Sequence, residues 1–121
     1  MVELSRLDIV LFDLEPTKGG EIKKIRSCVI VSPNIINCYS GTIIVCAITH
    51  YDKEKSKSYL LISVSANKAT GLKKKSLINT MQVRTIDRIR VIKKLGKLSK
   101  SLETSLDYAL TLALGTNQEV K

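Results

Sequence analysis

The sequence predicts a mainly β domain of the α+β class: a small antiparallel β-barrel, or strongly curved sheet, with one C-terminal helix. Short apolar and β-branched segments recur along residues 7–98, separated by stretches rich in Gly, Pro and Ser, as expected of strands joined by turns. From residue 101 the apolar positions change to helical spacing. A chain of 121 residues favours a single domain, 1–121, with its core at about 5–115.

Seven segments are predicted as strands from their composition and from the turn residues that bound them. In chain order they are 7–14, 27–33, 41–49, 58–65, 73–79, 80–87 and 88–98. The run 41–49 (GTIIVCAIT) is almost continuously apolar, which indicates a strand buried on both faces. Residues 33–41 are turn-rich and suit a short helical turn. We expect 88–98 to be an edge strand with cationic side chains on its open face.

Alternation within 80–87 places two polar side chains together. Gln82 and Arg84 are separated by Val83, so they share one face of the strand and point away from the core.

A helix is predicted over 101–114. Its apolar positions, spaced to form one face, are Leu102, Leu106, Ala109, Leu110 and Ala113. Ser99 or Ser101 can cap its start, and Gly115 ends it.

The charge balance favours a polyanionic partner. The chain has 20 Lys and Arg against 11 Asp and Glu, a net charge of +9, which suits nucleic acid, acidic proteins or an anionic membrane. The alternative is that the lysines serve solubility alone. No apolar run is long enough to span a membrane, and the N-terminus lacks a signal-peptide pattern, so we expect a cytoplasmic protein with no membrane partner.

The inventory of reactive side chains excludes several kinds of site. His50 is the only histidine, and no cluster with zinc spacing or phosphate-binding glycine motif occurs. The cysteines, Cys28, Cys38 and Cys46, are odd in number and lack C-x-x-C spacing, so we interpret them as reduced. The sequence therefore predicts neither a metal ion nor an organic cofactor.

The loop ahead of the second strand suits a phosphodiester. Its glycines, Gly19 and Gly20, allow a phosphate to approach the backbone, and Lys18, Lys23 and Lys24 supply positive charge. A plain hairpin with solvated charges is the alternative.

Two further residues could act on the same phosphate. Arg26 ends the loop, where a rigid sheet can aim its guanidinium at phosphate oxygens, unless it only pairs with Glu21. Thr49 ends the long apolar strand, and its hydroxyl can donate to the same phosphate; a threonine selected for strand propensity is the alternative.

These segments together resemble the MazF/PemK-type toxins of bacterial toxin–antitoxin pairs. The matching stretches are LDIVLFDLEPTKGGE, IRSCVIVS with Asn37, IIVCAIT, GLKKKSLINTMQVRTID, KKLGKL and the terminal helix, which cover nearly the whole chain. The resemblance implies a small SH3-like barrel that forms a two-fold homodimer. It also implies sequence-specific cleavage of single-stranded RNA without a metal ion, and an acidic antitoxin protein as partner.

The resemblance also assigns roles to residues. The catalytic pair falls on Arg26 and Thr49. The P-x-x-G-x-E loop falls on Pro16, Gly19 and Glu21. The residues expected to contact RNA are Thr17, Lys18, Gly19, Gly20, Lys24, Gln82 and Arg84.

Two positions depart from the family pattern. Leu7 stands where the family usually has Gly, and Ser27 replaces the usual Pro after the arginine. Neither change removes a reacting group.

The expected reaction is attack of the RNA 2′-OH on its own phosphorus, with Arg26 stabilising charge and Thr49 holding a phosphate oxygen. An arginine keeps its proton to about pH 12, so the general base is sought elsewhere. Glu21 is favoured by the family pattern, and His50 by the ordinary chemistry of imidazole.

The sequence is also compatible with three other interpretations. A small basic barrel can bind RNA without cutting it. A fold relative can poison a protein such as DNA gyrase, although that branch lacks the arginine–threonine pair. A degenerate toxin could retain dimer and antitoxin binding after losing activity.

Overall fold

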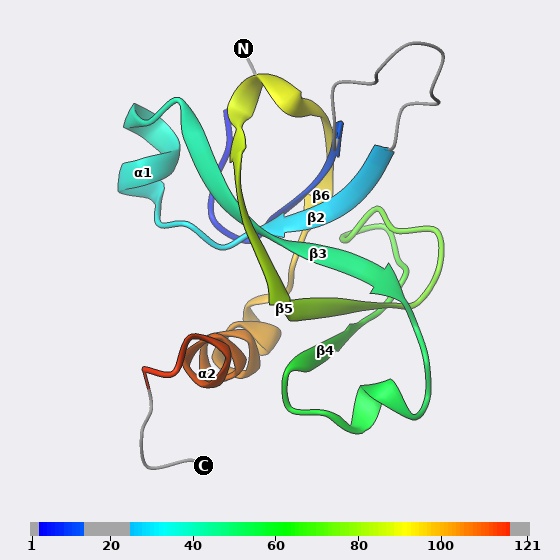
Figure 1. Cartoon of the computed structure of the whole chain (residues 1–121). Coiled ribbons are helices and arrows are strands. Elements are labelled where there is room, and N and C mark those ends of the chain that lie inside the picture. The colour runs from blue at the N-terminus through cyan, green and yellow to red at the C-terminus, as the bar shows by residue number, and fades with distance from the viewer. Residues whose placement is uncertain (1–2, 14–24, 117–121) are drawn as a thin grey trace, which may run out of the picture.

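The structure is a computed structural model that describes residues 3–13 and 25–116, and statements below concern these described residues. One six-stranded antiparallel sheet forms the molecule, in the order β4-β5-β3-β2-β1-β6 (Figure 1). Its strands are β1 (Asp8–Asp13), β2 (Ile25–Ile30), β3 (Thr42–His50), β4 (Leu61–Val64), β5 (Ser76–Asp87) and β6 (Val91–Lys97). Two α-helices complete the fold, α1 (Asn34–Tyr39) and α2 (Glu103–Leu114). The predicted class, mainly β with a C-terminal helix, is confirmed.

The sheet is strongly curved but open rather than a closed barrel. The edge strands β4 and β6 do not pair with each other. Register shifts interrupt the β1–β6 ladder twice and the β3–β5 ladder once. Such bulges bend a strand and increase its twist, which accounts for the curvature without closure.

Strands 73–79 and 80–87, predicted separately, form the single long strand β5. Ala47 of β3 pairs with Asn79 and Cys46 pairs with Val83, so three residues of β5 between them have no partner on β3. One of these, Thr80, turns to Leu60: its N–H and hydroxyl donate to that carbonyl at 3.1 and 2.7 Å. β5 therefore bends at the position where the sequence predicted that one strand ends and the next begins.

The other elements agree with the sequence within a few residues. A 3₁₀ turn, Arg88–Arg90, precedes β6, whose edge position is confirmed. Ser99 caps a 3₁₀ turn that leads into α2, and Gly115 ends α2 with a φ of 71°.

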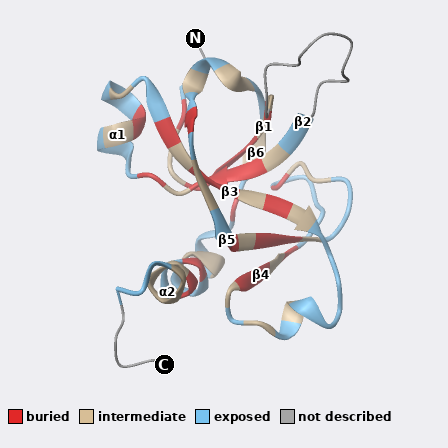
Figure 2. Ribbon diagram, viewed as in Figure 1, coloured by how far each residue is buried: buried red, intermediate tan, exposed pale blue. Residues whose placement is uncertain are grey.

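Two hydrophobic clusters lie on opposite faces of the sheet, because successive strand residues alternate between them. In β2, Val29 belongs to the larger cluster, while Cys28 and Ile30 belong to the smaller. Helix α2 covers the larger cluster by inserting Leu106 and Ala109, which are fully buried (Figure 2). Leucine, isoleucine and valine dominate this core, as expected for a chain with no Trp and one Phe.

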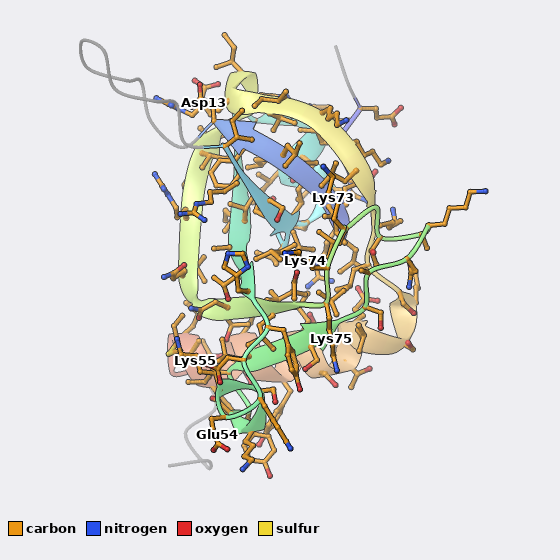
Figure 3. All side chains as sticks on the ribbon, turned by 90° about the vertical axis from the view of Figure 1, so that its right-hand side faces the viewer. Asp13, Glu54, Lys55, Lys73, Lys74 and Lys75 are labelled. Carbon is orange, nitrogen blue, oxygen red and sulfur yellow. The ribbon has the colours of Figure 1, made fainter. Side chains whose placement is uncertain are left out.

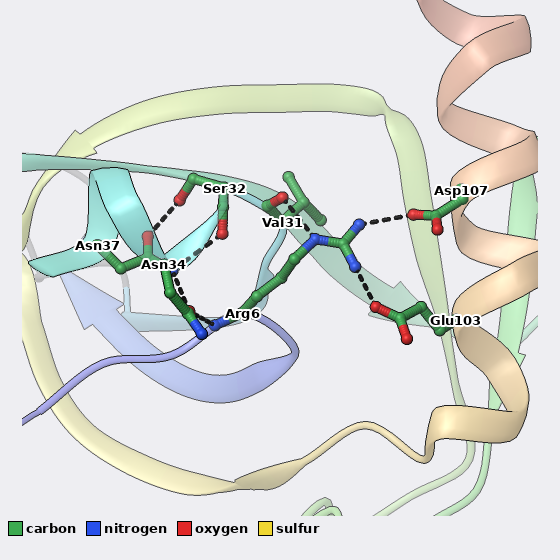
Figure 4. A network of polar contacts seen from close by, with 7 residues as sticks. All are labelled: Arg6, Val31, Ser32, Asn34, Asn37, Glu103 and Asp107. Atoms are coloured by element: carbon green, nitrogen blue, oxygen red, sulfur yellow. Dashed lines mark hydrogen bonds and ion pairs between the residues drawn. The ribbon is translucent and has the colours of Figure 1, made fainter.

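Arg6 anchors α2 to the start of the chain. Its Nη1 and Nη2 atoms lie 2.5 and 2.6 Å from carboxylate oxygens of Glu103 and Asp107, and its Nε donates to the Val31 carbonyl at 3.0 Å (Figure 4). The Arg6 N–H donates to the Asn34 side chain at 2.7 Å, so the same residue also contacts α1. A planar guanidinium with several donors suits such a junction.

Leu7 adopts a left-handed backbone conformation. Its φ is 75°, a region that favours glycine, and this is one of the two positions where the sequence departs from the family pattern. Its side chain is only 2% exposed and belongs to the larger cluster. A left-handed leucine costs about 1–2 kcal/mol, whereas burying its side chain contributes about 1.5–3 kcal/mol.

We expect Leu7→Gly to be at least as stable as Leu7→Ala. Both variants lose the buried side chain, and Leu7→Ala should lose about 2–5 kcal/mol of unfolding free energy, but only glycine relieves the backbone strain. Urea unfolding of both variants measures the order. Leu98 is the matched control, since it is equally buried and has an ordinary φ, so Leu98→Gly should be less stable than Leu98→Ala. If Leu7→Gly were also less stable than Leu7→Ala, the strain argument would be contradicted.

Candidate nucleic-acid interface

A groove of about 1000 Å³ lies where β1, β2, β3 and β5 meet β6 and the segment ahead of β5. Strands β2 and β3 supply Arg26, Ser27, Thr49 and His50. Further polar residues of the lining are Gln82 and Arg84 of β5, Lys73 and Lys74 ahead of it, and Lys93 of β6. The groove therefore brings together all five site residues that were predicted within the described part of the chain.

Arg26 and Thr49 both line the groove, from neighbouring strands. The paired part of β2 and β3 ends at Cys28 and Ala47, and each of the two residues lies two positions beyond that pair on its own strand. On the other side of β2, Arg26 pairs with Phe12. Arg26 therefore stands on a part of β2 that pairs with β1, on the same strand face as Cys28 and Ile30 of the smaller cluster.

The Thr49 hydroxyl has a weak partner. It donates to the Leu77 carbonyl at 3.4 Å, which is long for an O–H donor. A phosphate oxygen in the groove could therefore take over this hydrogen bond at little cost. His50 follows Thr49, is exposed, and lines the same groove.

Gln82 and Arg84 both line the groove, consistent with their shared strand face. Arg84 pairs in register with Val45, which belongs to the smaller cluster, so its face of β5 is the face that carries Arg26 and Thr49 on the neighbouring strands. The register shift next to Val83 allows this part of β5 to follow the curved sheet.

Sequence reasoning missed three cationic side chains of the groove, Lys73, Lys74 and Lys93. Figure 3 shows Lys73, Lys74 and Lys75 following one another along the face that extends from Asp13 towards Glu54 and Lys55. The run of three lysines between Gly71 and the strand was the available signal. It was taken as the start of a strand, whereas β5 begins only at Ser76.

The groove is cationic, with an apolar floor. Its described lining includes five Arg and Lys side chains and no carboxylate, together with apolar residues such as Leu11, Ile25 and Leu95. A cationic concavity with low-dielectric walls concentrates anions more strongly than isolated surface charges do.

The remaining predicted site residues lie outside the described residues. They are Thr17, Lys18, Gly19, Gly20, Glu21 and Lys24, and their roles stay predictions. The segment that contains them joins Asp13 of β1 to Ile25 of β2, two residues that pair with each other.

The cysteines do not form a reactive or metal-binding site in the described part of the chain. Burial raises the pKa of the Cys46 thiol to about 12 and raises that of Cys28 further, so both stay protonated and poorly nucleophilic near neutral pH. Cys38 is exposed on α1. Across residues 3–13 and 25–116, no group of three or more His, Cys, Asp or Glu side chains is placed to hold a metal ion.

None of the helices within the described ranges has the length and apolar character needed to cross a bilayer.

Comparison with known proteins places the chain among toxins. A family model described as a PemK-like, MazF-like toxin of type II toxin–antitoxin systems matches residues 5–114. An endoribonuclease MazF of Staphylococcus epidermidis is 38% identical over 115 residues, which cover 94% of this chain and 93% of that protein.

Solved structures share the fold. One is a MazE–MazF crystal structure from Deinococcus radiodurans, with a TM-score of 0.78 and 18% identity, covering 97% of this chain and 100% of that one. Another is the Mycobacterium tuberculosis toxin MazF-mt6, with a TM-score of 0.73 and 20% identity, covering 89% and 96%. The resemblance drawn from the sequence motifs is confirmed: the chain belongs to the PemK/MazF toxin family of type II toxin–antitoxin systems.

Proposed function

We propose that this chain is a toxin that acts as a sequence-specific endoribonuclease on single-stranded mRNA. The observation that carries the proposal is the groove, whose described lining contains both Arg26 and Thr49, five cations in all, and no carboxylate. The similarity to a Staphylococcus protein named as an endoribonuclease supports the same activity. Single strands suit the site because their unstacked bases can be read by side chains such as Gln82 and Arg84.

In the proposed reaction, the 2′-OH attacks the adjacent phosphorus and the bond to the 5′-oxygen breaks. One fragment keeps a 2′,3′-cyclic phosphate, and the other takes a proton to form a 5′-OH end. The reaction uses no metal ion or organic cofactor, so the protein supplies orientation, charge stabilisation and proton transfer.

Arg26 and Thr49 have separate tasks in this scheme. The guanidinium of Arg26 stabilises the extra charge on the pentacoordinate phosphorus, and it can donate a proton towards the leaving oxygen. The Thr49 hydroxyl leaves its long contact with Leu77 and donates to a non-bridging oxygen instead. Both groups can act only on a substrate that is bound in the groove.

Cleavage is expected to require the 2′-OH at the cleaved step. An RNA oligonucleotide carrying one 2′-deoxy nucleotide there should remain intact, because the nucleophile is missing, while it binds nearly as well as the all-ribose RNA. The experiment compares the fragments and the anisotropy of the two labelled oligonucleotides. Cleavage of the deoxy substrate at the same step would mean that water is the nucleophile, and would overturn the proposed reaction.

The general base should appear in the pH dependence of cleavage. We expect the rate to fall on the acid side, because only the deprotonated form of the base, Glu21 or His50, accepts a proton. Glu21 is favoured by the family pattern; His50 lies in the groove. Rate profiles of Glu21→Gln and His50→Asn identify the base by the loss of this limb. Wild-type rates in both variants would exclude both residues.

We further propose that the toxin works as a two-fold homodimer in the cytoplasm and is inhibited by an acidic antitoxin. A net charge of +9 favours an acidic protein segment that competes with RNA for the groove. A mycobacterial endoribonuclease with the same fold was solved in complex with its cognate antitoxin, which supports an antitoxin as a partner.

A further inference from the structure

An aromatic–cationic pair lies next to the groove, outside its lining residues. Tyr51 directly follows His50, and Lys75 directly follows Lys74, so each is the next residue after one that lines the groove. The Lys75 ammonium lies 4.3 Å from the centre of the Tyr51 ring. Figure 3 shows Lys75 on the side of the lysine run towards Glu54 and Lys55, away from Asp13.

The pair is open to solvent and loosely held. Tyr51 is 36% exposed, and its hydroxyl lies 3.4 Å from that of Ser56, which limits the tilt of the ring. Lys75 is exposed and forms no ion pair with a described residue. A cation over an exposed ring contributes only about 0.5–1 kcal/mol, so fold stability alone gives little reason for this arrangement.

The nearby carboxylates do not pair with Lys75. Asp52 accepts hydrogen bonds from the N–H groups of Glu54 and Lys55, at 2.9 and 3.1 Å. Glu54 itself pairs with Lys57 at 3.3 Å. The two acids of this turn therefore make their contacts within the turn, and Lys75 forms no ion pair with either of them.

We propose that Tyr51 and Lys75 form a second RNA subsite that binds a nucleotide flanking the cleaved step. In the structure the Lys75 ammonium lies over the Tyr51 ring and covers the face on which a base would stack. On binding, Lys75 leaves the ring to pair with the phosphate of the nucleotide, and its base takes the place of the ammonium on the ring. This inference rests on the proposed function only in taking RNA as the ligand of the adjoining groove.

An acidic protein segment fits this surface less well. Such a segment would use the ammonium but has no general need for an exposed ring, whereas every base of RNA can stack on it. Stacking is also insensitive to sequence, so the subsite should extend the bound RNA without adding to the recognition word.

The test compares the shortest RNA that is cleaved with versions extended by up to four nucleotides on either side. For the wild type, we expect kcat/KM to rise about tenfold when the extension reaches the subsite, the size expected for one stacked base and one phosphate contact. The ratio of extended to shortest RNA should fall to about one in Tyr51→Ala. In Lys75→Ala it should fall partly, with the slope of log affinity against log salt reduced by about 0.7.

Matched controls separate stacking from a general surface effect. Tyr51→Phe should keep the gain, because the ring remains. Tyr59→Ala should keep it too, since Tyr59 is 78% exposed and, among the described residues, no cation lies over its ring. An abasic nucleotide at the gaining position should remove the gain in the wild type only. The subsite would be overturned if kcat/KM of the wild type did not depend on RNA length, or if Tyr51→Ala kept the tenfold ratio. It would also be overturned if Tyr51 and Lys75 variants altered antitoxin inhibition but not the RNA length dependence.

Absence of cleavage can be distinguished from absence of the subsite. If no oligonucleotide is cleaved, anisotropy on the same length series still reports the subsite: a length gain that Tyr51→Ala removes supports it, and no gain refutes it.

Discussion

Arg26→Ala is expected to lower kcat/KM for single-stranded RNA by about 10²–10³-fold, because it removes the group that stabilises charge on the pentacoordinate phosphorus. The side chain is exposed at the end of β2, so the free energy of unfolding should change by no more than about 0.5 kcal/mol. Initial cleavage rates and urea unfolding measured on the same preparation separate the two effects.

Two further variants make the Arg26 result specific. Arg26→Lys keeps the charge but loses the planar fork, so it should recover only part of the rate. Lys100→Ala removes one exposed cation that does not line the groove, and it should cleave nearly as fast as the wild type. An equal loss in Arg26→Ala and Lys100→Ala would show that net charge, not the position of Arg26, sustains the rate.

Gly96→Ala should have a large effect on stability, a loss of roughly 2–4 kcal/mol. A Cβ atom on Gly96 would lie 2.2 Å from the Ala69 carbonyl oxygen and 2.5 Å from the Thr70 carbonyl carbon. Both are backbone atoms that cannot move aside by rotating a side chain. The Lys97 N–H donates to the same Ala69 carbonyl at 2.8 Å, so the clash falls on the contact that docks this turn on β6.

Gly41→Ala is the matched control for Gly96. A Cβ there would meet no atom within 4 Å, and the backbone is not left-handed, so the change should be within about 0.5 kcal/mol. Thermal or urea unfolding of both variants measures the difference. Equal stability of the two would show that the turn at Ala69 and Thr70 moves freely, and that the wall of the groove carrying Lys73 is not held by β6.

Most of the strands and the terminal helix were predictable because they depend on local patterns. Alternation in 80–87 was enough to place Gln82 and Arg84 on one face, and helical spacing with a final glycine marked α2. The bend in β5 was not predictable, because it arises from how Ala47 and Cys46 pair with that strand. Openness of the sheet is likewise a property of strands far apart in the sequence.

Within the site, it was easier to identify individual residues from the sequence than to predict which of them lie close together in the fold. Arg26 and Thr49 were singled out by motif, but their place in one groove depends on how β2 and β3 are arranged in the folded sheet. Lys93 comes from an edge strand whose lysines looked merely solvated, and only the folding of β6 against β1 brings it to the groove. The left-handed backbone of Leu7 also could not be read from a leucine, since the residue itself disfavours it.

The most direct test of the central proposal is to incubate the protein with a long mixed-sequence single-stranded RNA in EDTA and to map the fragment ends. Wild-type protein should produce discrete fragments with 2′,3′-cyclic phosphate and 5′-OH ends at one short sequence, and Arg26→Ala should leave the RNA intact over the same time. Intact RNA with the wild type, alongside clear binding, would contradict the proposed cleavage and identify the groove as an RNA-binding surface only. Fragments with 5′-phosphate ends would contradict the proposed reaction.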